Sequence, residues 1–406
     1  MTTGNEERER GKLAPGWPEI SYEPYPWVRT GDEVASRRAL LQARGDYSAA
    51  VPALIADAQV ALSAEAIALA DDASQELARF DAEAGTVTAP FASILLRTES
   101  ASSSEVENLT SSAKQVALAE IGESRSDNAR LVVANVNAMK AAIALSDRLD
   151  DTSILAMHDA LLRDTAPQYV GHWREEQVWI GGGGISPHAA TFVPPHHTRV
   201  PGLIADMLAF AGRTDVPVLI QAAIAHAQFE TIHPFPDGNG RTGRALLQGM
   251  LHHGRLTRNV TVPVSAGLLH DLDAYFSALT EYRAGRPEAI VTAVAEASFA
   301  AIQHSRALVT DIRATAKRWD SQVVARSDSS VHRLKAYLLR QPVVNTRTVA
   351  AELEISEVAA QNAIDKLVDA TVLTQTSTAR RNRTWQAPEI LAALDAFGAR
   401  ARRGRG

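Results

Sequence analysis

The sequence contains no cysteine, which excludes disulfide bridges and thiolate metal sites and fits a reducing compartment. No apolar run approaches the roughly 20 residues that a membrane-spanning helix needs. The 41 basic and 47 acidic residues give a net charge of only −6, so composition provides no overall nucleic-acid signature. Residues 1–13 are charged and lack an apolar centre, which is not typical of a signal peptide. We therefore expect a soluble, cytoplasmic protein.

The 406 residues are enough for two or three domains, and most segments carry helical rather than alternating apolar patterns. We predict a mostly α fold. Its expected parts are a disordered N-terminus, an N-terminal helical region, a helical core, a separate C-terminal unit and a basic, disordered tail, at residues 1–15, 16–125, 126–310, 327–390 and 391–406. Residues 16–28 are rich in proline and aromatic residues and are expected to be irregular. Helices are expected at residues 33–45, 50–82, 90–97, 127–147, 152–163, 271–282 and 287–304.

The most informative stretch is residues 233–244, with the sequence HPFPDGNGRTGR. Apolar residues at helical spacing precede it and resume after it, whereas Pro234 and Pro236 exclude helix where His233 and Asp237 lie. The stretch is therefore predicted to be a loop between two helices. The second helix is expected to begin near residue 239, with its N-terminus directed at the loop.

This loop has the features of a phosphate site. Gly238 and Gly240 allow successive N–H groups to turn toward one concavity at the positive end of a helix. Arg241 and Arg244 are three residues apart, so they share a face of the second helix. Both guanidiniums are expected to bind a polyphosphate that lies over the loop.

Asp237 and His233 add chemistry to the loop. Asp237 offers hard oxygen ligands suited to Mg²⁺, and His233 is the natural general base because its ordinary pKa lies near neutrality. Two other interpretations remain open: a glycine-rich turn that only caps a surface helix, and a fragment of a zinc site. The prolines disfavour the zinc site, since they remove the helix that would place positions 233 and 237 on one side.

His233 to Arg244 resembles the complete signature of Fic-domain proteins, H-x-F-x-(D/E)-G-N-G-R-x-x-R. The resemblance implies transfer of AMP from ATP to a Ser, Thr or Tyr hydroxyl of a target protein, with Mg²⁺ as cofactor. It further implies the following roles: His233 as base, Asp237 as metal ligand, Asn239 at the α-phosphate, Gly238 and Gly240 at the anion hole, Arg241 and Arg244 at the β- and γ-phosphates, and Thr242 and Gly243 within the same nucleotide-binding stretch.

A serine cluster followed by Glu107 has two interpretations. The first is a capping box that starts a helix, with Ser104 as N-cap and Glu107 at the third position. The second is a resemblance to the Fic inhibitory motif, (S/T)-x-x-x-E-(G/N), carried by Ser103, Glu107 and Asn108. That resemblance implies that Glu107 pairs with Arg244 and keeps the γ-phosphate from binding productively. One residue can serve both purposes.

Residues 173–195 contain a β-rich segment, the run 181–184 of four glycines, and a second β-rich segment, which together predict a hairpin. The region resembles the Fic flap, which implies that Val178 and Ile180 hold the target by strand addition. A plain edge hairpin is the alternative. A metal site of His188, His196 and His197 is disfavoured for lack of further ligands.

Tyr275 is the expected contact of the nucleotide base, although a buried aromatic side chain is the alternative. Fic relatives often carry two tyrosines and a later asparagine in this region, where this chain has Phe276 and Arg283. The departure leaves the identity of the base open. His158 is expected at a helix surface.

The part from about residue 327 resembles a winged helix-turn-helix, with helices at 331–339, 349–353 (after a start signal at 345–348) and 356–367 and wing strands at 372–375 and 384–386. Gln361 and Asn362 are the expected base-edge readers, with Arg380, Arg381 and Arg383 at phosphates. Glu357 and Asp365 on the same third helix leave DNA binding and a protein-interaction or dimerisation role equally open.

These features predict a protein adenylyltransferase that is auto-inhibited by Glu107. Two alternatives remain: a hydrolase that removes AMP at the same site, with Glu107 orienting water, and a DNA-binding regulator that uses the Fic core as a nucleotide sensor. The expected partners are ATP and a target protein, with a further DNA or protein partner, or a second copy of the chain, at the C-terminal unit.

Overall fold

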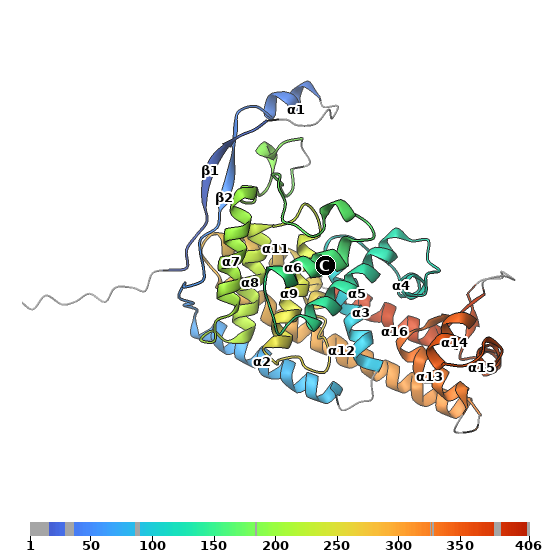
Figure 1. The fold of residues 1–406 in the computed structure, drawn as a ribbon. Coiled ribbons are helices and arrows are strands. Elements are labelled where there is room, and N and C mark those ends of the chain that lie inside the picture. The colour runs from blue at the N-terminus through green and yellow to red at the C-terminus, as the bar shows by residue number, and fades with distance from the viewer. Residues whose placement is uncertain are drawn as a thin grey trace, which may run out of the picture.

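The computed structural model describes residues 16–28, 36–85, 90–182, 185–324, 326, 329–376 and 383–403. The predicted mostly helical fold is confirmed: a body of packed helices carries a two-stranded sheet at one end and a three-stranded sheet at the other (Figure 1). The N-terminal segment 1–15, predicted to be disordered, lies outside the described residues. No helix in the described ranges is long and apolar enough to span a membrane.

The first two strands form an arm that projects from the body (Figure 1). Strand β1 (Ser21–Pro26) pairs antiparallel with β2 (Asp46–Val51), and the short helix α1 (Arg37–Gln42) lies between them in the chain. The prediction of an irregular segment at 16–28 and of a helix starting at residue 50 was therefore wrong. The prolines of β1 are tolerated because this strand pairs on one side only.

The helical body follows the apolar periodicity of the sequence. Its helices are α2 (Ala64–Gly85), α3 (Pro90–Val106), α4 (Ala113–Glu120), α5 (Asp127–Ala144), α6 (Asp151–Leu162), α7 (Val200–Ala211), α8 (Val218–Ile232), α9 (Asn239–His253), α10 (Val264–His270), α11 (Leu272–Arg283) and α12 (Glu288–Gln322). The helices predicted at 127–147, 152–163 and 271–282 are confirmed within a few residues.

Helix α3 contradicts the predicted capping box. The helix begins at Pro90 and ends at Val106, so Ser104 lies in its last turn rather than before its first. The Ser104 hydroxyl donates to the Ser100 carbonyl at 2.9 Å, the back-bonding to position i−4 that serines adopt inside helices. The capping interpretation was wrong because a serine followed three residues later by glutamate also fits the end of a helix that started much earlier.

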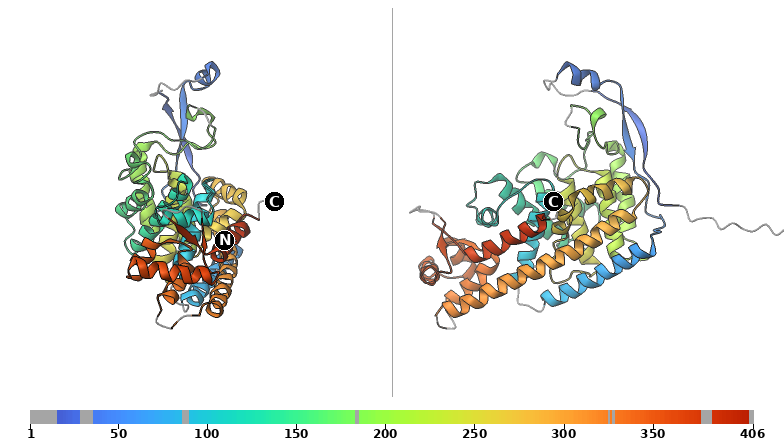
Figure 2. Two further views of the ribbon diagram at one scale, coloured as in Figure 1. Left: turned by 90° about the vertical axis from the view of Figure 1, so that its right-hand side faces the viewer. Right: turned by 180° about the vertical axis from the view of Figure 1, so that it is seen from behind.

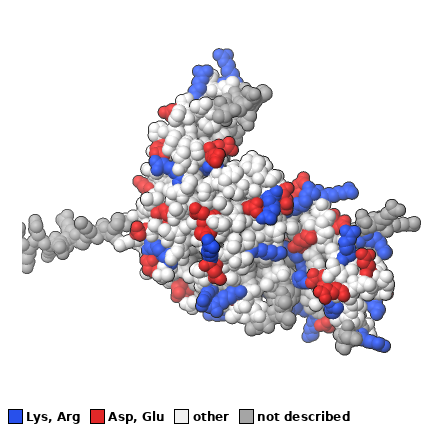
Figure 3. Space-filling model, in the orientation of Figure 1, with Lys and Arg blue, Asp and Glu red and all other residues white. Residues whose placement is uncertain are grey.

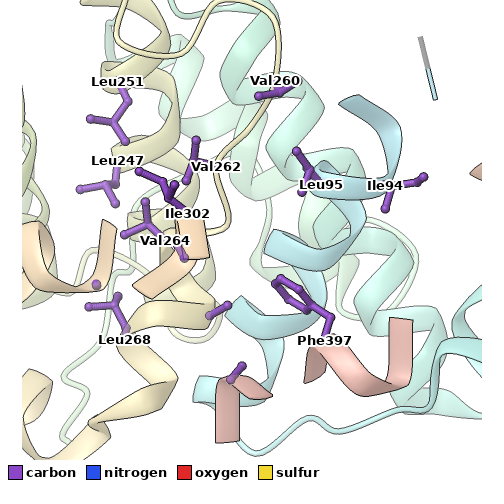
Figure 4. Close-up of a cluster of buried hydrophobic side chains, with 14 of the residues drawn as sticks. Ile94, Leu95, Leu247, Leu251, Val260, Val262, Val264, Leu268, Ile302 and Phe397 are labelled. Carbon is purple, nitrogen blue, oxygen red and sulfur yellow. The ribbon is translucent and has the colours of Figure 1, made fainter. Parts of the chain in front are cut away.

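Helix α8 runs through the centre of the body. Almost every side chain from Leu219 to Ile232 is buried, so the helix is enclosed on all sides. Aliphatic side chains from α3, α9, α10, α12 and the segment before α10 pack together beside it (Figure 4). Helices α2 and α16 (Pro388–Arg402) lie alongside the long helix α12 (Figure 2). This core fixes the ends of α8 and α9, between which the loop 233–238 lies.

The C-terminal elements occur in the order expected of a winged helix-turn-helix. They are α13 (Ser330–Arg340), β3 (Val343–Asn345), α14 (Thr346–Leu353), α15 (Glu357–Asp369), β4 (Thr374–Gln375) and β5 (Thr384–Gln386), with β5 central in the sheet. Ser356 is the N-cap of α15 and accepts from the Ala359 amide. The wing residues Arg380 and Arg381 lie outside the described residues.

The predicted disordered tail at 391–406 was wrong for its described part. Residues 388–402 form α16, and Ile390, Leu394 and Phe397 are buried on one side of it. The arginines of this segment drew attention to its charge, whereas the apolar residues at helical spacing determine its structure.

Gly267 lets α10 approach α12 closely, and this contact is testable. A Cβ at position 267 would lie 1.9 Å from the Ala297 carbonyl oxygen, which is backbone and cannot rotate away. We expect Gly267→Ala to lower the free energy of unfolding by about 2 kcal/mol or more, because overpacking shifts whole helices. Urea unfolding followed by circular dichroism measures the change.

Gly212→Ala is the matched control, since a Cβ there would meet its nearest atom at an ordinary 3.6 Å. A Gly267→Ala variant as stable as this control would contradict the close approach of the two helices.

Candidate active site

The loop between α8 and α9 has the predicted boundaries and an unusual backbone. His233 ends α8 in the left-handed region, with φ of 51°, and its amide donates to the Phe229 carbonyl at 2.9 Å. Gly238 is also left-handed, with φ of 77°, and precedes the first residue of α9. A left-handed histidine is strained, so neighbouring groups must hold it in place.

Asn239 supplies part of that support. Its amide accepts from the Phe235 N–H and donates to the Phe235 carbonyl, each at 2.8 Å, and its side chain is buried. The amide therefore fixes the loop through both of its polar atoms. Contact of Asn239 with an α-phosphate stays a prediction.

His158 supports the loop from α6. It is buried rather than at the surface, so that prediction was wrong. Its ring stacks on Phe235 with centroids 3.6 Å apart, and its Nε2 pairs with the Asp237 carbonyl at 3.0 Å. Burial lowers the pKa of His158 to about 4, so the ring is neutral. The prediction failed because the sequence of α6 alone does not show that His158 packs against the apolar underside of the loop.

Arg174 holds the loop from a third side and was not singled out by the sequence. Its Nε donates to the His233 carbonyl at 2.8 Å, its Nη1 to the Glu176 carbonyl at 2.9 Å and its Nη2 to the Pro195 carbonyl at 2.5 Å. The guanidinium is buried among these main-chain acceptors. Only an arginine offers enough donors to join the catalytic loop to both sides of the flap.

His233 lies beside a cavity of about 560 Å³. The cavity is lined by the loop, the flap, α11 and the end of α3. Burial, together with the nearby Arg174 and Arg283, lowers the pKa of His233 to about 3. The imidazole is therefore neutral at physiological pH and able to accept a proton.

Glu107 joins both arginines of the loop at the edge of this cavity. Its Oε1 lies 2.9 Å from Arg244 Nη2 and its Oε2 lies 2.6 Å from Arg241 Nε. Arg244 also donates to the hydroxyl and carbonyl oxygens of Ser103, at 2.9 and 2.8 Å. The structure thus brings Ser103, Glu107 and Arg244 together as expected, and adds an ion pair with Arg241 that the sequence did not indicate.

Gly240 allows this approach. A Cβ at position 240 would lie 2.5 Å from Glu107 Oε1 and 2.9 Å from Arg244 Nη1. Any larger residue would separate the carboxylate from the helix. The second glycine of the loop therefore makes room for the contact between Glu107 and Arg244.

Asp237 is the exposed carboxylate of the loop. Its side chain is 57% exposed, and Oδ1 accepts from the Gly238 amide at 2.7 Å and lies 3.5 Å from Arg241 Nη2. No group of three or more His, Asp or Glu residues in the described part of the chain is arranged to hold a metal, and this includes the flap histidines. A single exposed carboxylate fits a Mg²⁺ ion that takes its other ligands from phosphate and water.

The inner wall of the cavity contains polar side chains, of which the sequence indicated Tyr275 but not Glu230. Glu230, one turn before His233, is 7% exposed, and burial raises its pKa to about 7. Tyr275 is also buried, and its hydroxyl lies 2.9 Å from His226 Nε2. Arg283 lies over the Phe192 ring at 3.8 Å. Tyr275 borders the cavity, and its contact with a base stays a prediction.

The flap is less regular than the predicted hairpin. The described residues show an isolated bridge between Ile180 and Phe192, and Gly181 and Gly182 turn the chain with positive φ. Ile180 lines the catalytic cavity, whereas Val178 lines a neighbouring groove. Since the N–H and C=O of Ile180 already bond to Phe192 and Thr191, strand addition would have to use the alternate residues.

The C-terminal unit contacts α3 near Glu107. Arg97 of α3 donates to the Arg340 carbonyl at 2.6 Å and to Gln341 at 3.2 Å. Glu105 forms an ion pair with Arg402 of α16 at 3.0 Å. Helix α3 is therefore fixed between the catalytic core and the C-terminal helices.

The buried histidines predict a pH-dependent stability. Burial, with the nearby Arg244, lowers the pKa of His226 to about 3, whereas an unfolded histidine titrates near 6.5. Between these values the unfolded state binds more protons, so stability falls as pH falls below about 6.5. From pH 7.5 to 5.0, His226 accounts for a loss of about 2 kcal/mol.

In His226→Gln this loss is expected to shrink by that amount, measured as urea unfolding free energies at the two pH values. His172→Gln, at an exposed position, is the control and leaves the loss unchanged. An equal loss in wild type and His226→Gln would show that His226 is not buried in the neutral form.

Comparisons with known proteins agree with this geometry. The sequence pattern of the Fic/DOC family matches residues 148–251, and that of the Fic/DOC family N-terminal region matches residues 67–144. The Aquifex aeolicus (strain VF5) protein named "Probable protein adenylyltransferase aq_aa38" is 33% identical over 126 residues, which cover 28% of this chain and 36% of that protein. The Caenorhabditis elegans protein named "Protein adenylyltransferase fic-1" is 34% identical over 101 residues, which cover 25% of this chain and 19% of that protein.

A solved structure extends the likeness of fold beyond these matches. The crystal structure of a Fic family protein from Desulfovibrio desulfuricans G20 superposes with a TM-score of 0.52 over 81% of this chain and 97% of that chain, at 21% identity. The chain spans only about a third or less of the length of the two curated relatives above. The protein carries a Fic/DOC family domain at residues 148–251, preceded by a Fic/DOC family N-terminal region at residues 67–144.

Proposed function

We propose that the protein is an adenylyltransferase that moves AMP from ATP to a Ser, Thr or Tyr hydroxyl of a target protein, and that Glu107 inhibits it. The observation that carries the proposal is a pair of buried arginines, Arg241 and Arg244, that both form ion pairs with Glu107. They lie at the edge of a cavity that the neutral His233 also lines. The two curated relatives named above carry the same activity in their names.

The proposed reaction needs positioning and charge neutralisation. The target hydroxyl oxygen attacks the α-phosphorus, a new P–O bond forms, and the bond to pyrophosphate breaks. The hydroxyl proton passes to the imidazole of His233, which is neutral and therefore free to accept it. Arg241 and Arg244 hold the negative charge of the departing pyrophosphate.

Asp237 is the residue that would hold Mg²⁺. Its exposed carboxylate leaves Oδ2 without a protein partner among the described residues, while Oδ1 is held by the Gly238 amide. The ion would supply positive charge that neutralises the phosphates. The single carboxylate predicts that affinity for the ion depends on the bound nucleotide.

Inhibition by Glu107 follows from occupancy and charge. Two of its oxygens take donors of Arg241 and Arg244 that a polyphosphate would otherwise receive. The same negative charge repels an incoming phosphate. Both arginines are at most 3% exposed in their side chains, so solvent screens the competition weakly.

Nucleic acid is not the partner that the C-terminal unit favours. Helix α15 exposes Glu357, Asp365 and Asp369, and Gln361 bonds to Thr346 and Asp365 within the unit. Acidic and basic side chains are interspersed over the face shown in Figure 3, without a stripe of one sign. We therefore keep the enzyme as the proposed function of the whole chain.

Removal of Glu107 tests this function. We expect Glu107→Gly to increase the transfer of label from α-labelled ATP to protein by at least about tenfold, which corresponds to about 1.4 kcal/mol of released competition. Adding His233→Ala abolishes the transfer, because no neutral base remains. The readout is label retained on protein after denaturing electrophoresis.

Glu296→Gln is the control, since it removes the same charge from an exposed position of α12, outside the residues that line the cavity. Equal labelling by wild type and Glu107→Gly would reject inhibition by Glu107. Full labelling by the His233→Ala double variant would reject the base.

A further inference from the structure

A second groove adjoins the catalytic cavity. It has a volume of about 630 Å³ and lies between the N-terminal arm and the flap. Trp179 and Pro236 line both the groove and the cavity, so the two spaces meet at the flap and the catalytic loop. A chain that lies in the groove can therefore present a side chain to His233.

The arm is fixed to the flap, so the groove has two walls. The Ala50 amide of β2 donates to the Val193 carbonyl at 3.0 Å. The Tyr47 hydroxyl donates to Gln177 Oε1 at 3.1 Å. Below these contacts, Glu23 of β1 forms a bidentate ion pair with Arg199. The arm in Figure 1 thus extends the flap surface away from the body.

Aromatic side chains form the arm's contribution to the wall. Trp27 meets Trp179 edge to face with centroids 5.6 Å apart, and meets Tyr47 edge to face at 6.0 Å. Trp27 Nε1 is buried without a partner in the described part of the chain. Rigid aromatic walls of this kind bind extended chains at low cost in conformational entropy.

The exposed charged side chains that line the groove are acidic. Glu175 and Glu176 are both exposed there, and the one guanidinium beside them, Arg174, is buried and donates to the Glu176 main-chain carbonyl at 2.9 Å. The other titratable side chains at the groove include His196 and His197, whose pKa values are both lowered, first by burial, so they do not offset the carboxylates. The groove therefore attracts positive charge.

The main chain of the flap has hydrogen-bonding groups that are not used within the flap. The N–H and C=O of Trp179 form no backbone hydrogen bond with described residues, whereas those of Ile180 bond across the flap. Because consecutive residues of an extended chain point their main-chain groups to opposite sides, those of Trp179 point away from the Phe192 segment.

We propose that the groove binds an extended segment of the target protein that carries a Lys or Arg side chain a few residues from the modified hydroxyl. The basic side chain of the segment lies against Glu175 and Glu176, and its apolar parts pack against Trp27. This inference rests on the proposed adenylyltransferase function and adds the substrate class. It assigns a recognition role to the arm, which lies outside both matched family regions.

Synthetic peptides test the groove. The probe is a set of 13-residue fluorescent peptides centred on Ser, Thr or Tyr, with one Lys, Glu or Ala moved through the flanking positions. Binding to Glu107→Gly protein is measured by fluorescence anisotropy, and labelling from α-labelled ATP is measured on the same peptides. We expect Lys at the best position to strengthen binding about fivefold over Glu at that position, as one or two exposed ion pairs allow.

The variant Glu175→Gln/Glu176→Gln is expected to reduce this preference to within about twofold by raising the KM of Lys peptides, with kcat and the Ala peptides unchanged. Asp72→Asn/Glu296→Gln, at exposed positions of α2 and α12, is the matched control and keeps the preference. Trp27→Ala weakens binding of all peptides, whatever their charge.

Absence of peptide binding, absence of a charge preference, or a preference that survives Glu175→Gln/Glu176→Gln would overturn the groove assignment. Lys-selective binding without transfer of label to any peptide would support the groove and reject the proposed enzymatic function. The experiment therefore distinguishes a failure of the groove assignment from a failure of the proposed enzymatic function.

Discussion

The cavity depends on one carboxylate placed between two guanidiniums. Arg241 and Arg244 are almost completely buried, and a buried charge is costly unless an opposite charge and hydrogen bonds accompany it. Glu107 and Ser103 supply both in this structure. Under the proposed function, a triphosphate would compete with this carboxylate for the same two guanidiniums. Inhibition and the stabilisation of the buried arginines would then come from one interaction.

The catalytic loop is held from several elements at once. His233 has a left-handed backbone, which a histidine adopts only when its surroundings enforce it. Asn239 holds the loop from α9, His158 from α6 and Arg174 from the flap segment. Because Arg174 bonds to both the loop and the flap, the same guanidinium sets the position of His233 and the position of the flap.

The sequence was sufficient where structure is locally determined. Pro234, Pro236 and the two glycines fix a loop between helices whatever surrounds it, and the predicted boundaries of this loop are confirmed. The sequence was insufficient where distant segments meet. Arg174 and Glu230 join the site through the packing of the flap and α8. The strand character of residues 21–26 depends on pairing with β2. The helical structure of α16 was missed because the prediction gave its arginines more weight than its apolar residues at helical spacing.

The contacts between α3 and the C-terminal helices also affect the position of Glu107. Arg97 is held by the end of α13 and Glu105 by α16, while Glu107 follows the last turn of the same helix. Glu107, which contacts Arg241 and Arg244, therefore follows a helix that the C-terminal helices hold on its other side. Any shift of α13 or α16 that moved α3 would change the position of this carboxylate as well.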